Sequence, residues 1–259
     1  MHTLNLIEPA ASSIGFTILA FPDGQPHIKI DMASVPPPDK RETVRIYTRI
    51  TSPSDAMLLL FAKNALDYLE FQRVELYISY LMAARMDRVM LDGEPFSLKV
   101  VAALLNAGHF QKIKIFDPHS EVTTALIERS YAISNHAFVK DALSAYLSQH
   151  PGEPYCLVSP DAGALKKIHQ LASALQVDHV VECMKERDLK TGHLTNFKTT
   201  VEKLDGLTCF IVDDICDGGG TFAGTANMLK EKGAAKVVLI VSHGIFSKGT
   251  HIEQVDGIY

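Results

Sequence analysis

The feature that most constrains the fold is the alternation of short apolar runs with segments of helical periodicity. The apolar runs are rich in Val, Ile and Leu and end at turn residues, so each reads as a strand. Strands that alternate with helices are joined by right-handed crossovers, which gives a mostly parallel sheet. The expected fold class is therefore α/β. The main expected strands cover residues 44–50, 74–80, 112–116, 155–158, 179–183, 208–212 and 237–241.

Helices are expected between these strands. The first begins at Ser54 and Asp55, which have the chemistry of caps, and its apolar residues recur at helical spacing as far as Leu69. Two short strands are expected in 16–30 around a Pro-Asp-Gly turn, a polar loop in 184–198 and a turn in 213–220. The remaining expected helices cover 95–106, 159–175 and 221–232.

The length of 259 residues suits two small domains. We expect the boundary at the Pro- and Gly-containing segment 150–154, which gives domains 1–150 and 151–259, each a mostly parallel sheet flanked by helices. The repeated rhythm of the two halves is consistent with an old duplication.

Composition excludes several classes of protein. The net charge of −5 argues against sequence-independent binding to nucleic acid, which needs a basic face. No apolar run is long enough to cross a bilayer, and the first residues lack the basic start of a secretory signal. The four cysteines have no zinc-like spacing, so we expect buried thiols and a cytoplasmic protein.

Polar residues follow nearly every expected strand. Ligands of open α/β sheets bind outside the carboxyl ends of the strands, so these positions predict an active site. They are Asp117, His119, Asp161, Lys185, Arg187, Asp213, Asp214, Asp217 and His243, of which His243 is expected to be structural.

The strongest segment is 213–221. The carboxylates Asp213, Asp214 and Asp217 precede a glycine turn and a helix. Glycines let backbone N–H groups approach an anion, and the helix start favours negative charge, whereas carboxylates suit sugar hydroxyls. The segment therefore predicts a bound ribose phosphate, with the phosphate in the turn of Gly218, Gly219, Gly220 and Thr221. A turn with merely solvated acids is the alternative, which mutual repulsion of the acids disfavours.

This segment resembles the phosphoribosyl-pyrophosphate (PRPP) loop shared by type I phosphoribosyltransferases and ribose-phosphate diphosphokinases, also called PRPP synthetases. Further segments resemble the diphosphokinases in family order over nearly the whole chain. They are Phe21-Pro22-Asp23-Gly24-Gln25, Ala84-Arg85-Met86-Asp87-Arg88, Asp117-Pro118-His119, Ser159-Pro160-Asp161-Ala162-Gly163, Lys185-Glu186-Arg187 and Ser242-His243-Gly244-Ile245-Phe246-Ser247.

The resemblance implies two tandem phosphoribosyltransferase-like domains that transfer the diphosphoryl group of Mg-ATP to the 1-hydroxyl of ribose 5-phosphate. It implies catalytic roles for Lys185, Arg187 and His119, and Mg²⁺ near His119 and Asp161. An imidazole is an unusual ligand of Mg²⁺, so a hydrogen bond from His119 to phosphate is favoured over coordination. The ATP-binding residues would be Phe21, Asp23, Gln25, Arg85, Asp87 and Arg88. The segment around Phe21 would reach a neighbouring subunit of a homo-oligomer, a dimer or larger.

Several residues have plainer alternatives that the sequence leaves open. Arg85 and Arg88 have the character of ordinary surface cations, and Phe21 that of a core aromatic. His119 stands where it could cap a helix, and Asp161 could cap one while also binding metal.

The chain also departs from the family pattern. Met86 replaces the usual glutamine, Gly218 stands where threonine is common, and 89–94 lacks basic residues. The usual first strand and helix before Phe21 are expected to be largely missing, and 255–259 resembles the opening of a further strand, as in a compact or shortened variant. Two other functions remain open: a type I phosphoribosyltransferase, or a non-catalytic regulator that resembles a PRPP synthetase.

Overall fold

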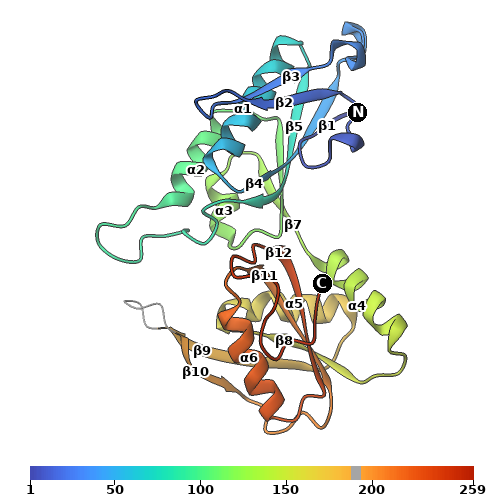
Figure 1. The fold of residues 1–259 in the computed structure, drawn as a ribbon, viewed down its shortest axis with the longest axis vertical. Helices are drawn as coiled ribbons and strands as arrows, with labels where there is room; N and C mark the ends of the chain where they lie inside the picture. Colours follow the sequence, from blue (N-terminus) through green and yellow to red (C-terminus); the bar gives the residue numbers. More distant parts are fainter. Residues whose placement is uncertain (188–193) are drawn as a thin grey trace. The chain divides into compact units, whose positions relative to one another are not determined.

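The computed structural model describes residues 1–187 and 194–259, with side chains described outside 186–196. The chain forms two compact units, Met1–Ser134 and Asn135–Tyr259 (Figure 1). The division falls earlier than the expected boundary at residue 150. Helix α4 (His136–Gln149) belongs to the second unit because Val139 and Leu143 pack into that unit's core.

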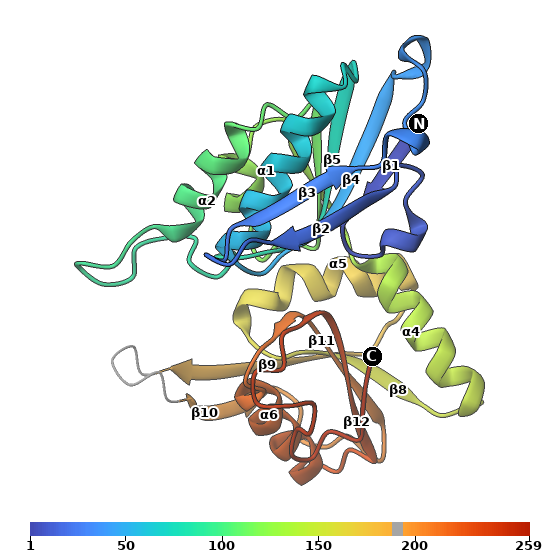
Figure 2. The ribbon, with the colours of Figure 1, turned by 45° about the horizontal axis from the view of Figure 1, so that its top comes forward.

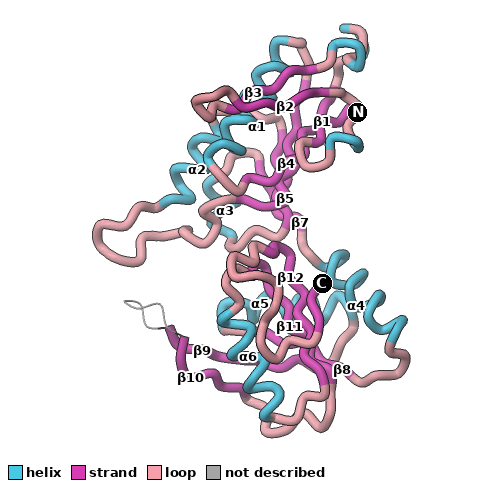
Figure 3. The backbone as a smooth tube through the Cα atoms, in the orientation of Figure 1, coloured by secondary structure: helices cyan, strands magenta, loops and turns pink. Residues whose placement is uncertain are grey.

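The first unit is built on a parallel sheet of five strands (Figure 3). Their order is β1 (His2–Asn5), β4 (Thr43–Ile50), β5 (Arg73–Leu81), β6 (Lys112–Phe116) and β7 (Ser130–Ile133). The expectation that the first strand is missing is wrong, because β1 pairs in parallel with β4. The expected hairpin is confirmed as β2 (Phe16–Ala20) and β3 (Pro26–Ile30), a separate antiparallel pair beside α1 (Figure 2).

Three helices complete the first unit. They are α1 (Pro53–Tyr68), α2 (Ser97–Asn106) and α3 (Glu121–Leu126). Helix α1 is capped by Ser52 rather than by Ser54: the Ser52 hydroxyl accepts the Asp55 N–H, and the Asp55 carboxylate accepts the Ser52 N–H. This reciprocal pair satisfies two donors that the first helical turn leaves open.

The second unit has a six-stranded sheet. Its order is β10 (Leu194–Thr199), β9 (Val180–Arg187), β8 (Tyr155–Ser159), β11 (Thr208–Cys216), β12 (Lys236–Gly244) and β13 (Gly257–Ile258). All neighbours are parallel except β9 and β10. The strand expected near 255–259 is therefore present. The α/β class with mostly parallel sheets is confirmed for both units.

Helices cover both faces of this sheet, with α5 (Leu165–Leu175) and α6 (Gly220–Glu231) on opposite sides (Figure 2). Successive residues of β11 explain this arrangement because they alternate between the faces. Cys209 and Ile211 pack in the core under α6, whereas Phe210 and Val212 pack in the core under α4 and α5. A strand buried on both faces reads as a continuous apolar run, as 208–212 does.

The polar loop expected at 184–198 is wrong for 184–187 and 194–198, because β9 continues to Arg187 and β10 pairs antiparallel with it from Leu194. Residues 188–193 of that expected loop lie outside the described part of the structure. Two tertiary contacts stabilise these polar strands. The ring of Phe197 packs on Gly224 of α6 so closely that a Cβ added to Gly224 would lie 2.2 Å from Cζ. The Thr199 hydroxyl also donates to the Glu182 carbonyl at 3.0 Å.

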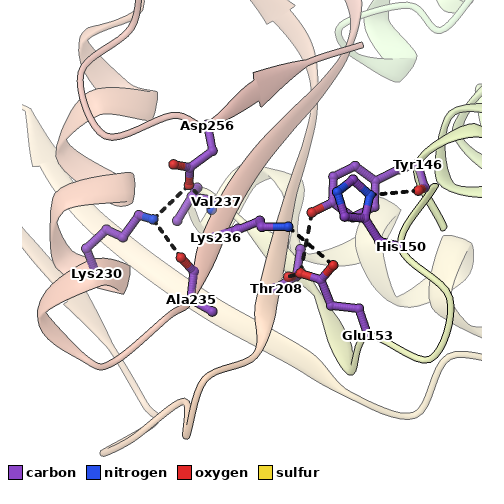
Figure 4. A network of polar contacts seen from close by, with 9 residues as sticks. All are labelled: Tyr146, His150, Glu153, Thr208, Lys230, Ala235, Lys236, Val237 and Asp256. Atoms are coloured by element: carbon purple, nitrogen blue, oxygen red, sulfur yellow. Dashed lines mark hydrogen bonds and ion pairs between the residues drawn. The ribbon is translucent and has the colours of Figure 1, made fainter.

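A polar network ties the second unit together at the amino ends of its strands (Figure 4). Glu153 accepts hydrogen bonds from the Thr208 hydroxyl and the Tyr146 hydroxyl, and its Oε2 lies 3.4 Å from Lys236 Nζ. Nearby, Asp256 accepts from Lys230 Nζ and the Val237 N–H, both at 2.7 Å. These contacts attach α4 and the segment before β13 to the sheet.

All four cysteines are buried free thiols, as expected, and Cys156 and Cys209 place their sulfurs 3.5 Å apart. Among the described residues, no helix is both long and apolar enough to cross a bilayer.

Candidate active site

Two acidic residues lie in strand β11 rather than in the turn where the sequence placed them. Pairing with β12 extends the strand to Cys216, so Asp213 and Asp214 are its sixth and seventh residues. Their side chains leave the strand toward opposite faces. The Asp214 N–H donates to Asp213 Oδ1 at 2.9 Å, and Asp214 is buried.

Burial and the neighbouring charge of Asp214 raise the pKa of Asp213 well above its ordinary value, and Asp161 adds to the effect. Carboxyl groups are therefore crowded at the carboxyl end of β11, and ionisation of Asp213 is disfavoured there. Groups that donate hydrogen bonds or carry positive charge would relieve this repulsion.

The glycine turn connects β11 to α6. Gly219 has φ +76°, and an added Cβ would lie 3.1 Å from Cγ1 of the buried Ile252, so the turn requires glycine there. Helix α6 starts at Gly220. The first N–H groups of a helix have no partner within it, so together with the turn they offer donors to an anion.

Lys185 joins three parts of this edge. It lies on β9, its Nζ is 2.8 Å from Asp161 Oδ2, and the same Nζ donates to Thr221 Oγ1 at 3.0 Å. Asp161 follows β8, and Thr221 stands in the first turn of α6. The structure therefore brings together three residues that are far apart in the sequence, around one cation.

Asp161 caps the start of a short helix, which is one of the two roles that the sequence left open for it. Its Oδ1 accepts the Ala164 N–H at 3.1 Å, at the start of a short 3-10 helix, Ala162–Ala164. With Lys185 on Oδ2, both carboxylate oxygens are engaged.

Two further candidates of this unit differ in how they are placed. Arg187 is the last residue of β9, and its side chain lies outside the described part of the structure. His243 is 5% exposed on β12, opposite Ile215, a position that suits the structural role expected for it.

In the first unit, Asp117 and His119 follow β6. Asp117 is buried with φ +36°, a conformation that few non-glycine residues adopt and that often accompanies functional sites. His119 is exposed and does not cap α3, because the cap position belongs to Ser120. The capping interpretation of His119 is thus wrong.

The other candidates of the first unit lie after β5 and in the β2–β3 hairpin. After β5, the side chain of Asp87 is mostly buried and that of Arg88 is mostly exposed, and Arg88 Nε lies 3.9 Å from Asp87 Oδ1. Arg85 also interacts with other residues. In the hairpin, Phe21 is 44% exposed, which excludes the core role. Asp23 Oδ1 accepts the Gln25 N–H at 3.0 Å and shapes the hairpin turn.

Two observations concern groups outside the predicted set. Within the described part of the chain, no three His, Cys, Asp or Glu side chains come together as a metal site. Lys248 was missed by the sequence analysis, although its stem runs beside Gly218: a Cβ added there would lie 3.6 Å from Lys248 Cδ. The available signal was its place just after the family-like segment that ends at Ser247.

Comparisons with known proteins agree along the chain. Residues 131–257 match the family model of the phosphoribosyl transferase domain. The chain is 29% identical over 256 residues to a ribose-phosphate pyrophosphokinase of Pyrococcus abyssi, covering 98% of this chain and 84% of that protein. It is 27% identical over 252 residues to the enzyme of that name from Thermococcus kodakarensis, covering 96% and 84%.

The fold also matches a solved structure. The crystal structure of phosphoribosylpyrophosphate synthetase from Mycobacterium smegmatis superposes with a TM-score of 0.73 and 22% identity, over 90% of this chain and 74% of that one.

Proposed function

The chain belongs to the ribose-phosphate pyrophosphokinase family, and on this premise we propose the reaction and the roles of its residues. The protein is an enzyme that transfers the diphosphoryl group of ATP to the 1-hydroxyl of ribose 5-phosphate. The hydroxyl oxygen bonds to the β-phosphorus of ATP, and the bond from that phosphorus to the bridging oxygen of AMP breaks. The hydroxyl proton passes to solvent, and the products are PRPP and AMP.

The observation that carries the sugar site is the position of Asp213 and Asp214 near the carboxyl end of β11, the strand that leads through the glycine turn into α6. Carboxylates accept hydrogen bonds from a ribose diol, which also relieves the repulsion that raises the pKa of Asp213. The N–H groups of the turn and of the helix start suit the 5-phosphate. We assign this site to Asp213, Asp214, Asp217, Gly218, Gly219, Gly220 and Thr221.

Lys185 is the proposed charge-stabilising residue. Diphosphoryl transfer depends chiefly on in-line positioning and on neutralising charge that develops on phosphate oxygens. Lys185 is fixed by Asp161 and Thr221 at the edge of the sugar site, so its ammonium needs little reorganisation to serve this purpose. Arg187, two residues along, is proposed to act with it, and His119 is proposed as a hydrogen-bond donor to the polyphosphate.

ATP is proposed to bind through Arg85, Asp87 and Arg88 together with the hairpin residues Phe21, Asp23 and Gln25. The exposed ring of Phe21 suits stacking on adenine, and the exposed Arg88 suits phosphate. The same exposure supports a homo-oligomer, a dimer or larger, in which the hairpin serves a neighbouring subunit. The buried free thiols fit the proposed location in a reducing cytoplasm.

Mg²⁺ is the proposed cofactor. This ion keeps several waters and is usually held by one or two protein ligands together with substrate phosphates. We propose His119 and Asp161 as candidate ligands, each beside the phosphates of the substrate. Asp161 already holds Lys185 and the Ala164 N–H, but each carboxylate oxygen has a second lone pair. When bound, the ion would neutralise charge on the polyphosphate.

The test supplies ATP, Mg²⁺ and ribose 5-phosphate and measures AMP and PRPP. Formation of both products supports the proposal. Binding of the substrates without turnover would identify a regulator instead. Consumption of PRPP with a free base would identify a phosphoribosyltransferase.

A further inference from the structure

The segment after β12 lies against the glycine turn of the proposed sugar site. A Cβ added to Gly218 would lie 3.6 Å from both Cδ and Cε of Lys248, which is ordinary van der Waals contact. Ile252 makes the neighbouring contact with Gly219. The aliphatic stem of Lys248 therefore runs beside the turn, and its ammonium is one bond further along.

Backbone hydrogen bonds hold Lys248 in this position. The Gly249 N–H donates to the Phe246 carbonyl at 2.9 Å, which closes a tight turn with Ser247 and Lys248 at its centre. The N–H groups of Ile245 and Phe246 donate to the Cys216 carbonyl at 2.8 and 3.2 Å. The turn that carries Lys248 is thereby attached to the last residue of β11, just before the glycine turn.

The proposed site is rich in acidic residues, so a further cation would favour the binding of a sugar phosphate. A sugar phosphate brings about two negative charges to an edge that already holds Asp213, Asp214 and Asp217. Lys185 is engaged by Asp161 at 2.8 Å. Lys248 is exposed and forms no ion pair with any residue that the structure describes. Its ammonium is thus available to an incoming anion.

We propose that Lys248 binds the 5-phosphate of the sugar substrate, its stem lying along Gly218 and its ammonium facing the phosphate in the glycine turn. This inference rests on the proposed function and adds to it a residue that determines affinity for the sugar phosphate. The glycine at 218 fits this role, because the turn presents no side chain between Lys248 and the anion.

The test compares Lys248→Ala and Lys248→Arg with the unchanged protein. Calorimetry with ribose 5-phosphate gives Kd, and steady-state assays give KM for each substrate and kcat. We expect Lys248→Ala to raise the Kd and KM for ribose 5-phosphate about tenfold, as loss of a charge-assisted contact does. The KM for ATP should change by less than about twofold, and Lys248→Arg should restore most of the affinity.

Lys203→Ala is the matched control, since Lys203 is also an exposed lysine of the second unit. It should leave every constant unchanged. The inference is overturned if Lys248→Ala keeps the original Kd for ribose 5-phosphate, or if it weakens ATP equally. The proposed function fails separately, if the unchanged protein neither binds ribose 5-phosphate nor forms AMP.

Discussion

The ammonium of Lys185 lies 2.8 Å from a carboxylate oxygen of Asp161, and both residues stand at the carboxyl edge of the second sheet. A residue on β9 is thus held by one that follows β8, and the same ammonium bonds to Thr221 of α6. The cation is positioned before any substrate arrives. Preorganised charge of this kind stabilises a transition state at little reorganisation cost.

Lys185→Ala should therefore lower kcat about 100- to 1,000-fold while changing the affinity for ribose 5-phosphate less than about threefold. Lys185 is proposed to stabilise the negative charge that develops on phosphate oxygens during transfer, whereas other residues are proposed to bind the sugar. Steady-state kinetics and calorimetry measure the two effects. Lys198→Ala, an exposed lysine on the paired strand β10, is the control. An equal loss of affinity and turnover would contradict the assignment of Lys185.

Gly224→Ala should displace the β9–β10 hairpin. The added methyl would lie 2.2 Å from Cζ of Phe197, so the ring must move away from α6. Because β9 carries Lys185, we expect kcat to fall at least about tenfold, together with a loss of stability of about 1–3 kcal/mol. The double variant Gly224→Ala, Phe197→Ala should recover part of the kcat. No recovery would show that Gly224 acts by another route.

Asp213→Asn should stabilise the free protein and abolish binding of ribose 5-phosphate. The pKa of Asp213 is raised by burial and by Asp214, so the folded state holds the proton to higher pH than the unfolded chain does. Stability therefore falls as the pH rises from the unfolded pKa through the raised folded value. The asparagine side chain does not ionise, so the variant does not lose stability as the pH rises. Its Tm at neutral pH should therefore rise by about 2–4 °C for each kcal/mol gained. Thermal melting between pH 4 and pH 9 tests this, and a lower Tm at neutral pH would count against it.

Glu153→Gln should act in the opposite sense. The hydrogen bond from Thr208, followed by that from Lys236, lowers the pKa of Glu153. The carboxylate therefore contributes stability above its ordinary pKa of 4.5, and this contribution is lost as the pH falls through the lower folded value. We expect Glu153→Gln to reduce Tm at pH 7 and to differ less from the unchanged protein below pH 4. A constant difference across that range would refute the linkage. Activity per folded molecule should not change.

The cysteine thiols should resist labelling in the folded protein. Burial raises the pKa of Cys183 to about 12 and that of Cys216 to about 11, so neither forms an appreciable thiolate at neutral pH. A chromogenic disulfide reagent should release its product from all four cysteines only after denaturation. Rapid reaction of even one thiol under native conditions would show local opening of the sheet.

The sequence predicted most strands of both sheets because their residues are buried on two faces and read as apolar runs. It failed where tertiary contacts decide the structure. The described residues of 184–198 are mostly polar, yet they form the strands β9 and β10, which the packing of Phe197 on Gly224 and the hydrogen bond from Thr199 to Glu182 stabilise. Asp213 and Asp214 read as a turn, yet pairing with β12 holds them in a strand.

The candidate site was predicted to a similar degree. Residues after strands could be recognised, since the carboxyl edge of a parallel sheet gathers them. The joining of Lys185 to Asp161 and Thr221 could not be seen, because it depends on the register of β9 and on where α6 starts. The position of Lys248 beside Gly218 could not be predicted either, because backbone hydrogen bonds to Cys216, and no sequence motif, hold the segment that carries it.

The network of Glu153, Tyr146 and Lys236 lies where β8, β11 and β12 begin (Figure 4). The acidic residues and the glycine turn lie at the opposite end of β11. The contacts that stabilise the fold and the residues proposed to act in the reaction thus lie at opposite ends of the same sheet. Protein engineers can then strengthen one terminus without disturbing the other. Harmful substitutions at the amino ends of these strands should lower the amount of folded protein, whereas harmful substitutions at the carboxyl ends should lower kcat.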